Sequence, residues 1–268
     1  MKNDKIEIKL GKEYSWLEPK PSKKLSRFGG AGDGGYVLSE NIPLLSEYLL
    51  SFGLGANIDF ELSIKKANPL IVIDVYDHTV KRPNKKQAWI NLIKSLLHRN
   101  LTHYKNYMHF YKSYNGVFLT GNHKENKVTN FKFNEYDVDI KDLLAENRSS
   151  SIILKIDIEG DEYRILPSVT KRAHKFTAII IEFHNIGVCQ VNFEKYMKEI
   201  SKTHIIEHVH ANNFSDLTSR GLPDVIEVTF IRKDLYQSGK KEKRYPIDKL
   251  DYPNTHRRRD FTIEWTKR

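Results

Sequence analysis

Short apolar runs alternate along the chain with longer amphipathic stretches, and each pattern predicts a different element. Apolar runs rich in Ile, Val and Leu predict buried strands, whereas apolar positions spaced three and four apart predict helices. The expected strands are residues 48–52, 70–76, 107–111, 151–156, 178–183, 205–209 and 225–231. The expected helices are residues 59–67, 85–101, 140–146, 161–166 and 193–201, and Pro167 should stop the fourth.

Strands that alternate with helices are typical of βαβ units. The pattern therefore predicts an α/β, Rossmann-like fold with a seven-stranded, mainly parallel sheet and helices on both faces. The last two strands have no clear helix between them and could form an antiparallel hairpin. We expect one domain over 1–268, with an N-terminal extension at 1–45 and a basic C-terminal extension at 233–268. Ligands of such sheets bind beyond the carboxyl ends of the strands.

Two glycine-rich stretches compete for the role of ligand-binding loop. Residues 30–35 (GAGDGG) match the dinucleotide pattern G-x-G-x-x-G, but a basic, polar stretch precedes them and an extended segment follows. Residues 51–57 (SFGLGAN) follow an apolar strand and precede a helix, so Gly53 and Gly55 are the better candidates. Ile58 stands where a dinucleotide loop has its third glycine, which disfavours a pyrophosphate cradle.

An acid follows at the end of the second strand, where a carboxylate can hold both ribose hydroxyls. Asp77 occupies this position. It could instead cap the segment that begins near His78 and Thr79. Loop and acid together predict an adenosine-type nucleoside without a required diphosphate, and S-adenosylmethionine fits this description.

Composition narrows the functional classes. The formal net charge of +10 favours anionic partners, and basic clusters at 240–244 and 257–259 could also form a solvated tail. No apolar run approaches the length that spans a bilayer, so we expect no membrane insertion. Cys189 is the sole cysteine, which excludes an intrachain disulfide and fits a cytoplasmic location. It is expected to be a buried or partly buried thiol.

Several short motifs, taken in order, resemble the FkbM-like class I methyltransferases. The most specific is LKIDIEGDE at 154–162. The others are DGGYVL at 33–38, SFGLG at 51–55, YDHT at 76–79, IEFH at 181–184, HVHANN at 208–213, DVIEV at 224–228 and LDYPN at 250–254. The resemblance covers nearly the whole chain. It implies methyl transfer from S-adenosylmethionine, usually to a hydroxyl of a sugar or another small metabolite.

The polar residues that leave the strands are the candidates for chemistry. Asp157 and Glu159 follow the fourth strand, Glu182 and His184 leave the fifth, and His208 and His210 lie on the sixth. A histidine suits proton removal from an alcohol, so His184 is the first candidate base and His210 the second, with Asp157 as a further catalytic residue. The expected cofactor-binding residues are Asp33, Gly34, Tyr36, Gly53, Gly55, Asp77, His78, Asp157 and Glu159.

The same acids and histidines could bind a divalent metal, although their spacing matches no standard metal motif. The candidate ligands are Asp157, Glu182, His184, His208 and His210. A bound metal would lower the pKa of the acceptor hydroxyl and replace the base. We expect no metal.

These observations favour an S-adenosylmethionine-dependent O-methyltransferase that acts on a hydroxyl of a sugar, sugar nucleotide or other phosphorylated small metabolite, in surface polysaccharide or related biosynthesis. The expected acceptor is an anionic sugar derivative. One alternative is a nicotinamide-dependent sugar-nucleotide oxidoreductase, against which Ile58 and the missing Tyr-x-x-x-Lys pair argue. Another is a non-catalytic anion-binding module, including one for nucleic acid. Scattered basic residues and acidic strand ends speak against nucleic acid. A homo-oligomer is compatible with the sequence.

Overall fold

The computed structural model describes residues 5–55, 57–98, 100–118 and 121–266. Ala56 of the predicted glycine loop and Arg99 of the predicted second helix lie outside them. The helices are α1 (Asp59–Ala67), α2 (Lys85–Leu97), α3 (Thr102–Val117), α4 (Ile140–Glu146), α5 (Glu162–Lys171) and α6 (Ile186–Ile200), with short 3-10 turns at Lys12–Leu17, Pro43–Leu45 and Ala173–Lys175. The strands are β1 (Ile6–Leu10), β2 (Leu25–Phe28), β3 (Tyr36–Ser39), β4 (Tyr48–Phe52), β5 (Val72–Tyr76), β6 (Asn122–Lys124), β7 (Lys127–Thr129), β8 (Asp137–Asp139), β9 (Ile152–Ile156), β10 (Phe176–Phe183), β11 (His204–Ala211), β12 (Ile226–Arg232), β13 (Arg244–Tyr245) and β14 (Phe261–Trp265).

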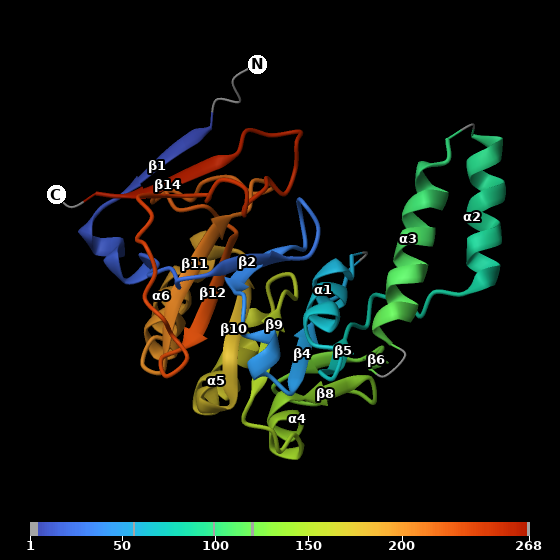
Figure 1. Cartoon of the computed structure of the whole chain (residues 1–268), viewed down its shortest axis with the longest axis horizontal. Helices are drawn as coiled ribbons and strands as arrows, with labels where there is room; N and C mark the ends of the chain where they lie inside the picture. Colours follow the sequence, from blue (N-terminus) through green and yellow to red (C-terminus); the bar gives the residue numbers. More distant parts are fainter. Residues whose placement is uncertain (1–4, 56, 99, 119–120, 267–268) are drawn as a thin grey trace.

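A seven-stranded sheet forms the centre of the molecule, in the order β11-β12-β10-β9-β4-β5-β6 (Figure 1). The pairs from β10 across to β6 are parallel, whereas β12 runs antiparallel to both β10 and β11. The predicted closing hairpin is therefore confirmed. The chain passes from β4 to β5 on one side and later returns to β9 on the other, so the strand order reverses between β4 and β9. Such a switch point is where open sheets bind ligands.

The sheet is buried on both faces, which explains its continuous apolar strands. Alternate residues of one strand enter different cores: Leu154 packs with α4, α5 and α6, whereas Ile153 packs with α1, α3 and β3. Successive side chains of a strand point to opposite faces, so each strand contributes to both cores. The predicted arrangement of helices on both faces is confirmed.

Four predicted elements are wrong in type or in their bounds. Residues 107–111 lie inside α3, and the strand expected there is supplied by β6, a short, partly exposed edge strand with little apolar signal. Pro167 does not stop α5, which continues to Lys171 because the buried side chains around the proline hold the helix against the core. Helix α6 begins at Ile186 rather than at Phe193, and the expected second helix ends at Leu97.

The two ends of the chain meet in a second, smaller sheet. Strand β1 pairs in parallel with β14, which pairs in turn with the short β13, so the basic C-terminal segment folds back onto the N-terminal one (Figure 1). Strands β2 and β3 form an antiparallel hairpin around the glycine-rich turn at 29–35. Because a strand and not a helix follows that turn, its match to the dinucleotide pattern has the wrong context, as expected.

Gly53 sets how closely β4 approaches β9. It has a φ of +83°, and a Cβ atom built on it would lie 1.6 Å from the carbonyl oxygen of Asp157. Gly55 also has a positive φ, of +57°, but a Cβ atom there would meet nothing within 4 Å. The first glycine is required by a backbone contact, whereas the second is required only by its conformation.

We predict that Gly53→Ala prevents stable folding or separates the ends of β4 and β9. Gly55→Ala should keep the fold and lose about 1–2 kcal/mol, the cost of a left-handed conformation for a residue with a Cβ. Chemical unfolding followed by circular dichroism measures both variants. Equal stability losses in the two proteins would contradict the proposed contact.

Candidate ligand-binding and catalytic site

Most of the predicted cofactor residues converge at the switch point, beyond the carboxyl ends of β4, β5 and β9. A cavity of about 160 Å³ lies there. It is lined by Gly53, Gly55, Asp77, His78, Asp157 and Glu159, all predicted from sequence, together with residues of the β5–α2 and β6–β7 connections. Asp33, Gly34 and Tyr36 are not among the lining residues.

The carboxylate of Asp77 holds the glycine loop. One of its oxygens accepts hydrogen bonds from the amides of Leu54 (2.7 Å) and Gly55 (3.0 Å), and the other accepts from the amide and hydroxyl of Thr79. Burial would raise the pKa of Asp77, but the Thr79 hydroxyl and these amides outweigh it and lower the pKa. The amide of Gly53 donates to the carbonyl of Tyr76. Three successive loop amides are therefore already paired within the protein.

The glycine-rich turn at 29–35 leans on this loop. The Arg27 guanidinium donates to the carbonyl oxygens of Gly30 and Gly32 and so fixes the turn. The side chain of Asn57 donates to the carbonyl of Asp33 at 2.8 Å, which links turn and loop. Tyr36, just after the turn, is buried and donates from its hydroxyl to Asp157 at 3.2 Å. The turn is therefore connected to the cavity through Tyr36, because its partner Asp157 lines the cavity.

A buried lysine supplies the positive charge at the end of β9. The Lys155 ammonium donates to the carbonyl of Gly53 at 2.6 Å and lies 3.7 Å from the Asp157 carboxylate and 4.0 Å from Glu61. Burial lowers the pKa of Lys155, but the charges on Asp157 and Glu61 outweigh it and raise the pKa, so the ammonium stays protonated. Asp157 is therefore compensated by a resident cation of the protein.

His184 does not line the cavity itself but lies beside two residues that do, Asp157 and Glu159, and a fully buried carboxylate holds it there. Its Nδ1 lies 3.0 Å from Glu162, whose same oxygen accepts the amides of Ile158 and Gly160. Its Nε2 lies 3.5 Å from Glu159 and 3.8 Å from Glu182. Burial lowers the pKa of His184, whereas its hydrogen bond to Glu162 and the charge there raise it, and the net shift is upward. A neutral His184 that donates from Nδ1 to Glu162 leaves Nε2 free to accept a proton.

Glu182 joins a buried group of acids behind His184. It accepts a hydrogen bond from Asn212 at 2.7 Å. Asn254, from the C-terminal extension, donates to both Glu227 (2.8 Å) and Asp33 (3.1 Å). Burial and the charges of Asp157 and Glu227 raise the pKa of Glu182 well above its ordinary value. Glu182 is thereby shifted toward its neutral form.

The two histidines of β11 are engaged elsewhere. His208 lies 3.0 Å from Asp251 and His210 lies 3.3 Å from Glu227, so neither joins the predicted metal cluster. Burial lowers the pKa of His210, but the charge and hydrogen bond of Glu227 outweigh it and raise the pKa to about 9. A histidine that is protonated at neutral pH cannot accept a proton, which weakens His210 as a candidate base. His184 also lies beside the cavity residues Asp157 and Glu159, whereas His210 is paired with Glu227.

The described residues bring Asp157, Glu159 and His184 together, with one potential ligand atom of each within 4.8 Å of the others. This set shares only Asp157 and His184 with the ligands predicted from sequence. The Asp157 carboxylate already has the Lys155 ammonium and the Tyr36 hydroxyl as partners. The donor set therefore gives no support for a metal ion.

Sequence reasoning missed several residues that organise the site. Glu162 appears in the sequence analysis only as part of the motif LKIDIEGDE, with no role predicted for it, yet its carboxylate is fully buried and orients His184. Asn254 and Asp251 lie in the expected C-terminal extension. Their motif, LDYPN, was the available signal, but no pattern in the chain indicated that they reach the strand ends.

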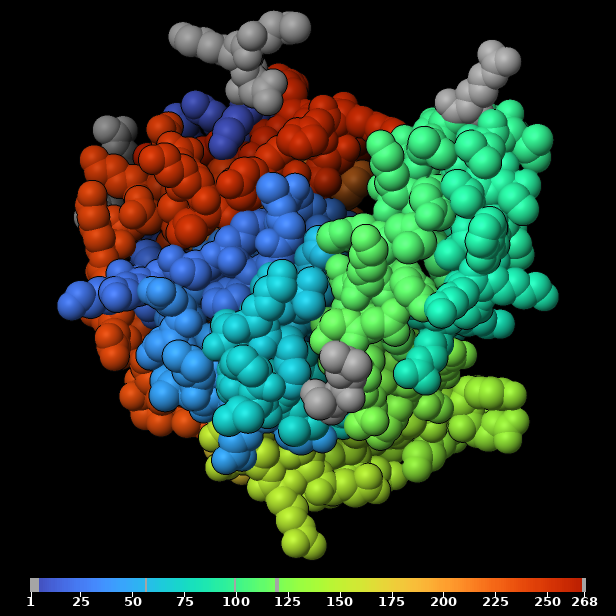
Figure 2. All heavy atoms as spheres, turned by 45° about the vertical axis from the view of Figure 1, so that its right-hand side comes forward, coloured from blue at the N-terminus to red at the C-terminus, as the bar shows by residue number. Residues whose placement is uncertain are grey.

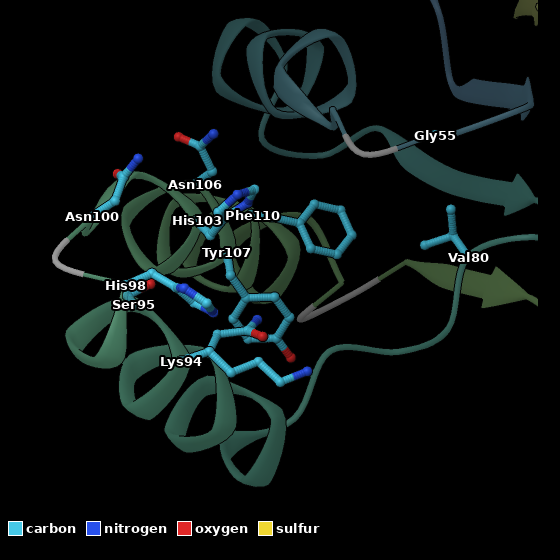
Figure 3. A pocket seen from close by; sticks show the side chains of 11 residues that line it. Gly55, Val80, Lys94, Ser95, His98, Asn100, His103, Asn106, Tyr107 and Phe110 are labelled. Atoms are coloured by element: carbon cyan, nitrogen blue, oxygen red, sulfur yellow. The ribbon is translucent and has the colours of Figure 1, made fainter.

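Two larger cavities adjoin the small one. One of about 700 Å³ shares Lys127, Val128 and Asp161 with it. Another of about 750 Å³ shares Gly55 and lies between this loop and the hairpin formed by α2 and α3. Figure 3 shows the second of these, with Tyr107 and Phe110 of α3 directed into it and Val80 at its far side. The glycine loop therefore borders the cavity of about 750 Å³ as well as the one of about 160 Å³.

No family model matches the chain, and no curated protein matches it. Solved structures show only distant similarity. A precorrin-6y C5,15-methyltransferase from Geobacter metallireducens GS-15 is 10% identical, with a TM-score of 0.36 over 76% of this chain and 95% of that chain. The fibrillarin/Nop5p complex gives 9% identity and a TM-score of 0.37 over 70% and 73% of the two chains.

A 16S rRNA (adenine(1408)-N(1))-methyltransferase from Catenulisporales acidiphilia, solved with its cosubstrate SAM, is 9% identical, with a TM-score of 0.31 over 80% of this chain and 100% of that chain. At such low TM-scores these similarities carry no argument about this protein. The resemblance to FkbM-like enzymes stays a prediction.

We predict that Glu162→Gln lowers the pKa of His184, because the substitution removes the carboxylate charge and keeps a hydrogen-bond acceptor. Titration of the His184 ring by NMR measures the shift. Glu159→Gln is the matched control, since its side chain is 87% exposed and water screens its charge. A His184 pKa that is unchanged in Glu162→Gln, or that falls more in the control, would show that Glu162 does not tune the ring.

Proposed function

We propose that this protein is an S-adenosylmethionine-dependent O-methyltransferase of Rossmann-like fold that acts on a sugar hydroxyl or a related small metabolite. One observation carries the proposal: the amides of Gly53, Leu54 and Gly55 are all paired within the protein. A loop that cradles a pyrophosphate needs such amides free. This loop suits a nucleoside that reaches the switch point without phosphates.

The charge of the cavity supports the same ligand. Its lining carries the carboxylates of Asp77, Asp157, Glu159 and Asp161 beside Lys127. Acidic groups attract a sulfonium cation and repel a diphosphate. The cavity therefore fits the cationic methyl donor, and Asp77 stays a candidate for the ribose hydroxyls if one of them replaces the Thr79 hydroxyl.

When bound, the donor supplies a methyl group on a positively charged sulfur, which an acceptor oxygen can attack in line as the carbon–sulfur bond breaks. The protein aligns the acceptor and removes its proton. His184 Nε2 is the proposed proton acceptor, and Glu162 keeps the ring in the tautomer that exposes this atom. Glu182, shifted toward its neutral form, limits the negative charge facing Nε2. Lys155 and Tyr36 hold Asp157 at the cavity.

The rival oxidoreductase gains no support from the loop. Ile58 is buried at the start of α1, in the position where a dinucleotide loop brings helix and strand together through glycine. The acceptor itself is proposed from net charge and resemblance: an anionic sugar derivative is attracted by the +10 surface.

We expect calorimetry to detect binding of S-adenosylmethionine and S-adenosylhomocysteine but not of NAD. Asp77→Ala should weaken binding by about 1–3 kcal/mol, because the ribose hydroxyls of the ligand would lose their charged acceptor. Asp74→Ala, which removes another carboxylate of β5 outside this cavity, is the matched control and should leave affinity intact. Binding of NAD alone, or of neither nucleoside, would contradict the proposal.

With an acceptor in hand, His184→Ala should cut turnover on the order of 10²–10⁴-fold while cofactor affinity stays nearly unchanged. The wild-type rate should rise with pH through the pKa of His184, which is raised above the ordinary value of a histidine, because only the neutral ring accepts a proton. His174→Ala, an exposed histidine away from the cavity, is the control. Full activity of the His184 variant would remove it as the base.

A further inference from the structure

Helix α2 presents an unusual row of exposed apolar side chains. Trp89, Ile93, Leu96 and Leu97 are 66%, 54%, 60% and 76% exposed. Their spacing of four, three and one residues places them on one side of a helix. We call these four residues the α2 stripe. Soluble proteins seldom expose several large apolar residues together without a partner.

The opposite side of α2 faces the protein. Ser95 is buried, and Ser95 and His98 line the cavity between the helices together with His103 and Tyr107 of α3 (Figure 3). The hydroxyl of Tyr107 bonds the backbone of Asn84 and fixes the start of α2. Figure 1 shows α2 as the outermost element of the hairpin, and Figure 2 shows the hairpin as a lobe at the edge of the molecule. The stripe therefore faces away from the body.

The segment that carries the stripe is entirely without acids. Residues 78–124 contain no Asp or Glu. Lys85 and Lys86 are exposed on the first turn of α2. Around the helix axis, one of them lies on each side of the position of Trp89. The basic residues of the segment are Lys81, Arg82, Lys85, Lys86, Lys94, Arg99, Lys105, Lys112 and Lys124. The face is both apolar and cationic.

We propose that the α2 stripe docks this protein onto an anionic membrane surface. An apolar row with Trp at its start sinks into the boundary between headgroups and acyl chains, while flanking lysines contact acidic headgroups. The helix would lie in the plane of the membrane, and no described helix is long and apolar enough to cross one. Docking is independent of the methyl-transfer proposal.

Charge and side-chain type favour lipid over other occupants. A second copy of the chain would bring another segment without acids against this one, so no carboxylate of 78–124 would offset the lysines. A nucleic acid would use the lysines, but Ile93, Leu96 and Leu97 have no flat face on which a base can stack. A bilayer with acidic headgroups can contact both the apolar stripe and the lysines.

Flotation with vesicles tests the proposal on the full chain. We expect binding to vesicles of equal parts phosphatidylcholine and phosphatidylglycerol, weaker binding at high salt, and little binding to phosphatidylcholine alone. Trp89→Ser with Leu96→Ser should lower the partition coefficient at least about tenfold. Lys85→Gln with Lys86→Gln should lower it about fivefold per lysine.

Two matched variants control for general stickiness and charge. Val188→Ser with Val191→Ser removes exposed apolar side chains from α6, and Lys240→Gln with Lys243→Gln removes exposed lysines from the C-terminal extension. Both should bind vesicles like the wild type. The proposal is overturned if vesicles do not bind, if the controls lose as much binding as the α2 variants, or if the α2 changes only dissociate a dimer or release RNA.

Discussion

The backbone contact between Gly53 and the carbonyl of Asp157 is the constraint on which the site depends. It brings the ends of β4 and β9 so close that only glycine fits between them. With the strands at this spacing, the Lys155 ammonium reaches the carbonyl of Gly53 while remaining near Asp157. The loop that follows is closed from the other side by Asp77. The switch point thereby becomes a small acidic cavity at which the amides of Gly53, Leu54 and Gly55 are already paired.

Burial of several carboxylates around one cavity sets the electrostatics of the site. Unpaired charges in the interior cost several kcal/mol each, so each acid needs a cation, donors or a proton. Asp157 has Lys155 and Tyr36, and Glu227 has His210 and Asn254, whereas Glu182 is shifted toward its neutral form. Two of these partners, Tyr36 and Asn254, come from the N-terminal and C-terminal segments. The terminal segments therefore complete the site, in addition to forming a sheet of their own.

Most of the central sheet followed from local patterns, and the failures have physical causes. Residues 107–111 are rich in aromatic side chains that also suit strands, but packing of α3 on α1 and α2 decided for helix. The edge strand β6 buries little, so its sequence carried no apolar run. Pro167 costs one helical hydrogen bond, and the buried residues beside it outweigh that loss. Within the site, the sequence did indicate Asp77, Asp157 and His184, because each is a polar residue that follows an apolar run at the end of a strand.

By itself, the sequence determined the alternation of strands and helices, the glycine loop and the acids that follow the strands. These features depend on neighbours within a few residues, where period and backbone conformation act directly. Only the tertiary structure decided that Glu162 orients His184, that His210 pairs with Glu227 and that Asn254 reaches Asp33. Such contacts join residues that are distant in the chain or hidden among equivalent acids. Burial, which no local pattern specifies, then selects which of them stay charged.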